Sequence, residues 1–209
     1  MVSVSEATSI IAAHLFAPQA ESIRISEAHN KVLAAPLYAD RDFPPFNRVA
    51  MDGIAIQFDQ LKKGQTTFEI EDVAAAGVPQ KSLQEKTHCM EVMTGAPLPE
   101  NTDTVIRYED LEIKEKRATL LTTAIDAQQN VHTQGQDAKQ NQLLLQPGAQ
   151  LSAAEIALIA SVGLTHVSVK STPRTAILST GDELVDIGSI PQAHQIRRSN
   201  SYALEAGLL

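Results

Sequence analysis

Four short stretches combine an acid or a hydroxyl with glycine, and they are the residues best suited to chemistry. They are AMDG (50–53), MTGAPLP (93–99), TQGQD (133–137) and LSTGDEL (178–184). Glycine lets backbone N–H groups approach an anion closely, a hydroxyl adds a donor, and carboxylates bind hard cations such as Mg²⁺. Together the stretches indicate phosphate chemistry, although each alone is also typical of an ordinary turn or a solvated strand end.

The sequence before the first of these acids, FPPFNRVAMDG (43–53), restricts the backbone. Pro44 and Pro45 each fix φ and move the preceding residue out of the helical region. The chain then delivers Asp52 beside Gly53, which can adopt backbone angles that other residues avoid. This pattern predicts that the Asp52 carboxylate is held in a defined position.

Other familiar sites are missing from the sequence. It contains no phosphate-binding P-loop, dinucleotide-binding glycine motif, zinc-protease helix or serine-hydrolase elbow. The six histidines are scattered without ligand spacing, which favours surface or satisfied core positions. In a strand, His88 and Cys89 point to opposite faces, so a thiol nucleophile is not expected.

Composition limits the class of protein. The 209 residues, 43% hydrophobic and 20% charged, can bury one or two ordinary cores. A formal net charge of −8 without a dense basic run argues against a nucleic-acid surface. The single cysteine fits a reducing compartment, and the start of the chain resembles no signal peptide. We expect a cytoplasmic protein that binds neither nucleic acid nor a membrane.

The N-terminal elements are predicted to be helical. Ser3 and Glu6 fit a capping box, and Ile10, Ile11 and Leu15 would form a buried stripe on the helix that follows. A short β-like piece at 23–25 leads to a second helix, which is expected to begin at the N-cap Ser26 and end before Pro36.

The middle of the chain is predicted to be mostly β, and helices return after it. Short apolar and alternating runs separated by turns fill the region from Gly53, and the Gln-rich stretch 127–142 is expected to be a surface loop. Ser152 and Glu155 form a second capping box, with Gly163 in the position of a C-terminal cap. Thr175–Ser179 is predicted to be a buried strand before the acidic turn, and a final helix begins near 200.

The four stretches in this order resemble one family, the molybdopterin molybdenumtransferases (MoeA), which are related to the C-terminal domain of gephyrin. EAHNKVLAAPLYAD, PPFNRVAMDGIAI, MTGAPLPENTDTVIRYED and IRRSN extend the resemblance over nearly the whole chain. It implies a mixed α and β fold in three parts. These are an elongated helical linker or dimerisation domain (1–46 and 141–173), an inserted mostly-β domain (47–140) and the truncated start of an α/β molybdopterin-binding domain (174–209).

The resemblance also implies a reaction and its residues. Molybdenum from molybdate is inserted into adenylylated molybdopterin, AMP is released, and Mg²⁺ supports the phosphate chemistry. The residues carried over as catalytic are Asp52, Thr94, Asp137 and Glu183, and the three acids among them are expected to bind Mg²⁺. The residues expected to bind the molybdopterin cofactor are Gly95, Ser179, Thr180, Gly181 and Asn200.

Two departures from the family pattern keep an alternative open. Val49 stands where many members carry Ser, and members are about twice as long, so we expect the N-terminal part of an enzyme. The resemblance implies a homodimer, with the molybdopterin adenylyltransferase as a further partner. The alternative is a non-catalytic dimerisation or scaffold module. We further expect 174–209 to be the least stable part of the chain, and the chain to be inactive alone.

Overall fold

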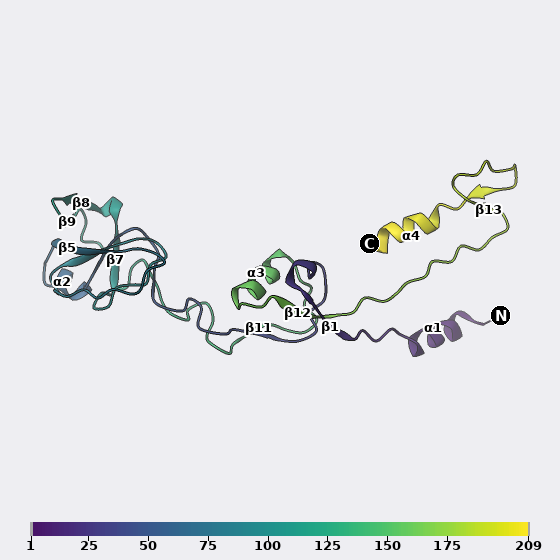
Figure 1. Ribbon diagram of the computed structural model, residues 1–209, viewed down its shortest axis with the longest axis horizontal. Coiled ribbons are helices and arrows are strands. Elements are labelled where there is room, and N and C mark those ends of the chain that lie inside the picture. The colour runs from purple at the N-terminus through teal and green to yellow at the C-terminus, as the bar shows by residue number, and fades with distance from the viewer. Residues whose placement is uncertain (1, 209) are drawn as a thin grey trace. The chain divides into compact units, whose positions relative to one another are not determined.

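The computed structural model describes residues 2–208 (Figure 1). The chain divides into two compact units. The first unit combines Met1–Glu21 with Lys170–Leu209, and the second is Ser22–Val169. Each unit is described by itself below.

A six-stranded sheet forms most of the second unit. Its strand order is β7-β4-β6-β5-β9-β8, with β5 and β6 parallel and every other pair antiparallel. The strands are β4 (Gly53–Ile56), β5 (Thr67–Ala74), β6 (Cys89–Val92), β7 (Thr104–Arg107), β8 (Leu111–Lys114) and β9 (Arg117–Leu120). A short helix, α2 (Phe58–Lys62), follows β4. The prediction of a mostly-β region is therefore confirmed.

Two clusters of buried side chains cover the two faces of this sheet. Ala55 and Val105 belong to one cluster, whereas Ile54, Ile56 and Ile106 belong to the other. Successive residues of a strand point to opposite faces, so a strand buried on both sides must be apolar throughout. This explains the uninterrupted GIAI run of β4, in which all four residues are buried.

The rest of the second unit has its own core around helix α3 (Ala153–Ser161). Ser152 and Glu155 form the predicted capping box, and Gly163 ends the helix with a φ of +79°. Two small two-stranded sheets lie beside it. One pairs β2 (Leu37–Tyr38) antiparallel with β11 (Leu143–Leu145), and the other pairs β1 (Ala20–Arg24) with β12 (His166–Lys170).

The predicted helix from Ser26 to Pro36 is wrong. Only a 3-10 turn, η1 (Ile25–Glu27), forms there, and Asn30 reverses the chain with a φ of +63°. Leu33 then forms an isolated bridge with Val169 and is 2% exposed in the core around α3. Pairing with a distant strand has therefore overridden local helix propensity.

The first unit carries helices without buried faces. Helix α1 (Val4–Ala13) begins as predicted, because Ser3 accepts a hydrogen bond from the Glu6 backbone N–H. The predicted buried stripe is wrong, since Ile10, Ile11 and Leu15 are at least half exposed. Helix α4 (Asn200–Leu208) and the parallel pair β13 (Leu184–Val185) and β14 (Ile196–Arg197) complete the unit.

The predicted strand at Thr175–Ser179 is also wrong. This segment has no regular secondary structure, and Leu178 is 87% exposed. A buried strand needs neighbours on both edges and cover on both faces, and the described part of the first unit provides neither here.

The mixed α and β fold class is confirmed, and the second unit contains a curled sheet. The three predicted domain boundaries stay a prediction. Within residues 2–208, no helix combines the length and the apolar character needed to cross a bilayer.

Candidate functional site

Asp52 and Thr94 are in direct contact. The Thr94 backbone N–H and its side-chain hydroxyl both donate to Oδ1 of Asp52, each at 2.6 Å. The sheet register explains the contact, because Gly53 of β4 pairs with Val92 of β6. Asp52 lies just before β4 and Thr94 just after β6, so the two motifs meet at the same end of an antiparallel pair.

These two hydrogen bonds lower the pKa of Asp52. The side-chain hydroxyl of Thr94 has the larger influence, its backbone N–H adds to it, and partial desolvation opposes both. Asp52 is therefore ionised at neutral pH. Both bonds use Oδ1, and Asp52 is exposed, so Oδ2 can face a ligand.

Gly53 allows the backbone to carry Asp52 to this position. A Cβ atom at residue 53 would lie 1.9 Å from the carbonyl oxygen of Ile106 on β7. Only glycine permits so close an approach of two strands. Gly53 is therefore required by the packing of β4 on β7, and it directly follows the acid.

Residues 47–50 link the AMDG turn to the two other predicted loops of this unit. On one side, Val49 accepts a hydrogen bond from the Gly95 N–H and donates one to the Ala96 carbonyl, at 2.9 and 3.0 Å. On the other side, β3 (Arg48–Val49) pairs antiparallel with β10 (Val131–His132). The TGAP loop and the TQGQD loop thus share one central segment.

The second predicted acid of this unit, Asp137, contacts a histidine. His132 Nε2 lies 3.0 Å from Asp137 Oδ1, and His132 Nδ1 lies 3.0 Å from Nη2 of Arg48. A guanidinium has no acceptor, so it must donate to Nδ1, and the imidazole proton is then on Nε2. We infer a neutral His132 that accepts from Arg48 and donates to Asp137.

Val49 and Gly95 have structural roles that the sequence did not reveal. Val49 is completely buried in the core cluster of the sheet, so its side chain faces away from the exposed Asp52 and Thr94. Gly95 has a φ of +87°, which favours glycine and lets the TGAP loop turn back onto Val49.

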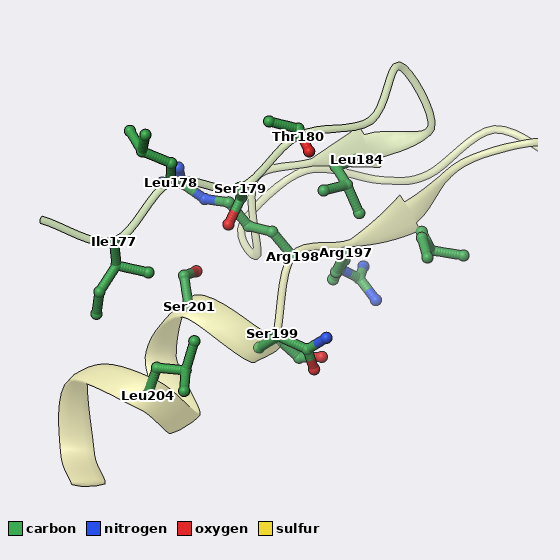
Figure 2. Close-up of a pocket in the computed structure, with 12 residues that line it drawn as sticks. Ile177, Leu178, Ser179, Thr180, Leu184, Arg197, Arg198, Ser199, Ser201 and Leu204 are labelled. Carbon is green, nitrogen blue, oxygen red and sulfur yellow. The ribbon is translucent and has the colours of Figure 1, made fainter. Parts of the chain in front are cut away.

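The predicted cofactor residues Ser179, Thr180 and Asn200 line one pocket in the first unit (Figure 2). The pocket has a volume of about 360 Å³ and lies between the extended segment that carries Ile177 to Thr180 and the start of α4. Arg197 and Arg198 also line it, so hydroxyls, an amide and two guanidinium groups lie beside apolar side chains, and Arg198 forms an ion pair with Asp186. Such a donor set suits an anionic ligand.

Gly181 and Glu183 lie next to each other beside this pocket. A Cβ atom at Gly181 would lie 2.6 Å from the carboxylate oxygens of Glu183, so the acid folds back over the glycine. The Glu183 carbonyl accepts from the Ile196 N–H at 2.8 Å, which ties the acidic turn to β14.

The three acids predicted to bind a metal do not form one cluster in the described structure. Asp52 and Asp137 bond to Thr94 and His132, whereas Glu183 belongs to the other unit. Among residues 2–208, no group of three His, Cys, Asp or Glu side chains could hold a metal ion. The metal-binding role of Asp52, Asp137 and Glu183 therefore stays a prediction, as do the catalytic and cofactor roles.

Cys89 is unsuited to nucleophilic chemistry. It is completely buried, and desolvation raises the pKa of its thiol to about 12, with smaller contributions from Glu91 and Glu71.

Sequence reasoning missed Arg48 and His132. Both lie within five residues of a predicted acid, but their pairing depends on the β3–β10 register, which neither local pattern encodes. The Gln-rich composition around His132 indicated only a loop.

Comparisons with known proteins identify relatives over the whole chain. The chain is 39% identical to the molybdopterin molybdenumtransferase of Synechocystis sp. over all 209 of its residues, which correspond to 54% of that protein. It is 31% identical to the molybdopterin molybdenumtransferase of Haemophilus influenzae, covering 98% of this chain and 51% of that protein. The chain thus spans about half the length of these curated relatives.

A solved structure and a family model agree with these relatives. The crystal structure of the molybdopterin biosynthesis protein MoeA from Pyrococcus horikoshii matches with a TM-score of 0.79 and 27% identity, covering 99% of this chain and 54% of that one. The family model described as "MoeA N-terminal region (domain I and II)" matches residues 2–163. The chain with the Asp52–Thr94 contact therefore belongs to the MoeA family and contains its N-terminal region.

Proposed function

We propose that this chain takes part in molybdenum cofactor biosynthesis by contributing to the insertion of molybdenum from molybdate into adenylylated molybdopterin, with release of AMP. The observation that carries the proposal is the Asp52–Thr94 contact, because it joins the AMDG and TGAP motifs into one exposed, ionised site. Membership of the MoeA family and the names of the relatives support the substrate class.

In this proposal the chain positions groups and charge. Thr94 fixes one oxygen of Asp52, which leaves the other oxygen directed to solvent and available to a cation. The donor set is oxygen, as Mg²⁺ prefers, and Mg²⁺ is commonly held by one or two carboxylates together with phosphate oxygens and water. When bound by Asp52, with Asp137 and Glu183 as further candidates, the ion would neutralise phosphate charge.

The first unit would bind the anionic part of the substrate. Ser179, Thr180 and Asn200 line a pocket whose rim carries Arg197 and Arg198. Hydroxyl and guanidinium donors of this kind recognise phosphate. We propose Gly181 and Glu183 as neighbouring contacts because they form the turn beside the pocket.

Assembly is part of the proposal. A homodimer would cover the apolar side chains that α1 leaves exposed, among them Ile10, Ile11 and Leu15. The molybdopterin adenylyltransferase would supply the substrate as a partner, in the cytoplasm. The alternative of a non-catalytic scaffold module predicts the same dimer without a requirement for the Asp52 charge.

The test uses a chimera in which this chain is joined to the matching C-terminal half of the Synechocystis relative. Asp52→Asn keeps the size of the side chain and removes its charge, so we expect molybdenum insertion to fall at least about 100-fold with near-normal folding. The matched control is Asp59→Asn on α2, an exposed acid that forms a surface ion pair with Lys62. Insertion from adenylylated molybdopterin and molybdate is the assay.

Two outcomes decide between the proposals. Activity of Asp52→Asn within a factor of two of the parent chimera would contradict the role of the Asp52–Thr94 site. A folded, dimeric parent chimera with no insertion activity would favour the scaffold alternative.

A further inference from the structure

Arg48 is exposed and forms no ion pair with any residue between 2 and 208. The arginines that form ion pairs in the part of the chain described are Arg41, Arg107 and Arg198. Arg48 instead donates from Nη2 to the neutral acceptor Nδ1 of His132. A guanidinium has five N–H donors, so most of those of Arg48 are left for a ligand.

The backbone of Arg48 contacts both the TGAP loop and the strand that leads into the TQGQD loop. Its backbone forms an isolated bridge with Pro97 of the TGAP loop on one side and pairs with His132 of β10 on the other. Its neighbour Val49 bonds to Gly95, the residue that follows Thr94. Arg48 therefore lies on the segment that both loops contact, four residues before Asp52.

His132 gives this cation a fixed orientation without cancelling its charge. Asp137 accepts from Nε2, which holds the ring in the tautomer that presents a lone pair to Arg48. Arg48 thus donates to an imidazole nitrogen rather than to the Asp137 carboxylate, and this hydrogen bond restricts the rotamers of the guanidinium.

We infer that Arg48 binds a tetrahedral oxyanion of the substrate beside Asp52 and Thr94, and that His132 is the residue that positions Arg48. The inference rests on the proposed function, which supplies two oxyanions of this kind, the phosphate of the adenylylated molybdopterin and molybdate. A guanidinium matches both, because its planar fork donates two parallel hydrogen bonds to adjacent oxygens. Asp52 itself repels an anion, so a site that handles one needs a cation nearby.

The first test measures binding by the 209-residue chain itself, with molybdate and AMP as separate probes in isothermal titration calorimetry. We expect Arg48→Gln to weaken binding of one probe by about 10- to 100-fold, the range for a lost charge-assisted hydrogen bond. Loss for AMP identifies the phosphate as the ligand, and loss for molybdate identifies the metal oxyanion. The control Arg117→Gln removes the same charge at an exposed position on β9 and is expected to leave binding unchanged.

The second test separates positioning from a merely structural role of His132. His132→Leu removes the acceptor for Arg48 and is expected to weaken the same probe by about 3- to 10-fold. In the double variant with Arg48→Gln, we expect no further loss, because a residue that acts through Arg48 has nothing left to position. If the two substitutions acted independently, their fold losses in probe affinity would multiply in the double variant.

The inference is overturned if the parent chain binds neither probe at millimolar concentration, or if Arg48→Gln binds both like the parent. It is also overturned if the two variants multiply their effects. These outcomes are distinct from failure of the proposed function, because insertion by the parent chimera and its loss in Asp52→Asn are measured without any change at Arg48.

Discussion

The two units of this chain differ in how they hold their candidate site residues. All the buried hydrophobic residues of the described chain lie between Ala28 and Val169, within the second unit. In the first unit, neither α1 nor α4 has a buried residue. The Asp52–Thr94 contact is therefore built on a packed sheet, whereas the pocket around Ser179 is built on exposed segments. Of the two sites, only the Asp52–Thr94 contact is therefore preorganised by a buried core of this chain.

The contrast is clearest between two apolar runs of similar length. GIAI in β4 has a partner strand on each side and is completely buried. TAILS at 175–179 has no regular structure, and its Leu178 is almost fully exposed. Similar composition thus gives opposite outcomes, because burial requires partners for the backbone as well as apolar side chains.

Hydrogen exchange should show the largest difference between the units. We expect amides of β4 to exchange at least about 1,000-fold more slowly than those of Thr175–Ser179, since core strands open only with global unfolding and exposed segments open locally. Exchange followed by mass spectrometry at low protein concentration, where association is negligible, is the measurement. Slow exchange throughout Thr175–Ser179 would erase the contrast.

A glycine substitution should break the better-packed unit. Gly53→Ala forces a Cβ atom into the Ile106 carbonyl, so we expect a loss of about 3 kcal/mol or more in the free energy of unfolding. Urea denaturation followed by circular dichroism measures it. The control is Gly64→Ala, where φ is also positive but no atom lies within 4 Å, and a loss of about 1 kcal/mol is expected. Equal losses for the two variants would show that β4 and β7 can move apart.

The same isoleucine-to-alanine change should have different costs in the two units. Ile159 of α3 is completely buried, so Ile159→Ala is expected to cost about 2–4 kcal/mol of unfolding free energy. Ile10 of α1 is 50% exposed, and Ile10→Ala is expected to change it by less than about 0.5 kcal/mol in the monomer. Thermal unfolding at several protein concentrations checks both. A cost for Ile10→Ala that grows with concentration would place Ile10 in the proposed dimer interface.

The smallest change is expected in the pKa of Asp52 and in the stability that depends on it. Its pKa in the folded chain lies below the ordinary value of 3.8, so the Asp52–Thr94 contact contributes stability at neutral pH and loses it as the pH falls through that lowered pKa. Thr94→Val removes the hydroxyl and keeps the backbone N–H, so the pKa should rise part of the way back. Carboxyl NMR titration measures it, with Thr119→Val on β9 as the control. An unchanged pKa would mean that the hydroxyl does not stabilise the carboxylate.

Local signals predicted the elements that depend on nearby residues. The capping box at Ser152 and the glycine at Gly163 correctly bounded α3, because caps are formed by residues within one turn. Asp52 and Thr94 were singled out through the AMDG and TGAP motifs and the family resemblance that these motifs carry. Its direct contact was not predicted, because it depends on the pairing of β4 with β6.

The wrong predictions share one physical cause. The stretch after Ser26 has helical spacing, but Leu33 is taken into a bridge with Val169, more than 100 residues away. The apolar run at 175–179 and the stripe of α1 have the right pattern and no partner in the described structure. The Arg48–His132–Asp137 chain was missed for the same reason, because register across β3 and β10 is a tertiary property.

The shared segment 47–50 also limits how the site could be altered. Asn47 accepts from the Leu98 N–H through its backbone and from the Gln134 N–H through its side chain, so it touches both loops. Deleting or inserting one residue here would shift the register on both sides at once and exchange buried Val49 with an exposed neighbour. The β8–β9 hairpin turns at Glu115 and Lys116, and this turn bonds to one neighbouring strand, through the Lys116 carbonyl that accepts from the Ile70 N–H of β5. Changes in chain length should therefore accumulate in that hairpin among related sequences, and the TGAP and TQGQD loops should vary only together.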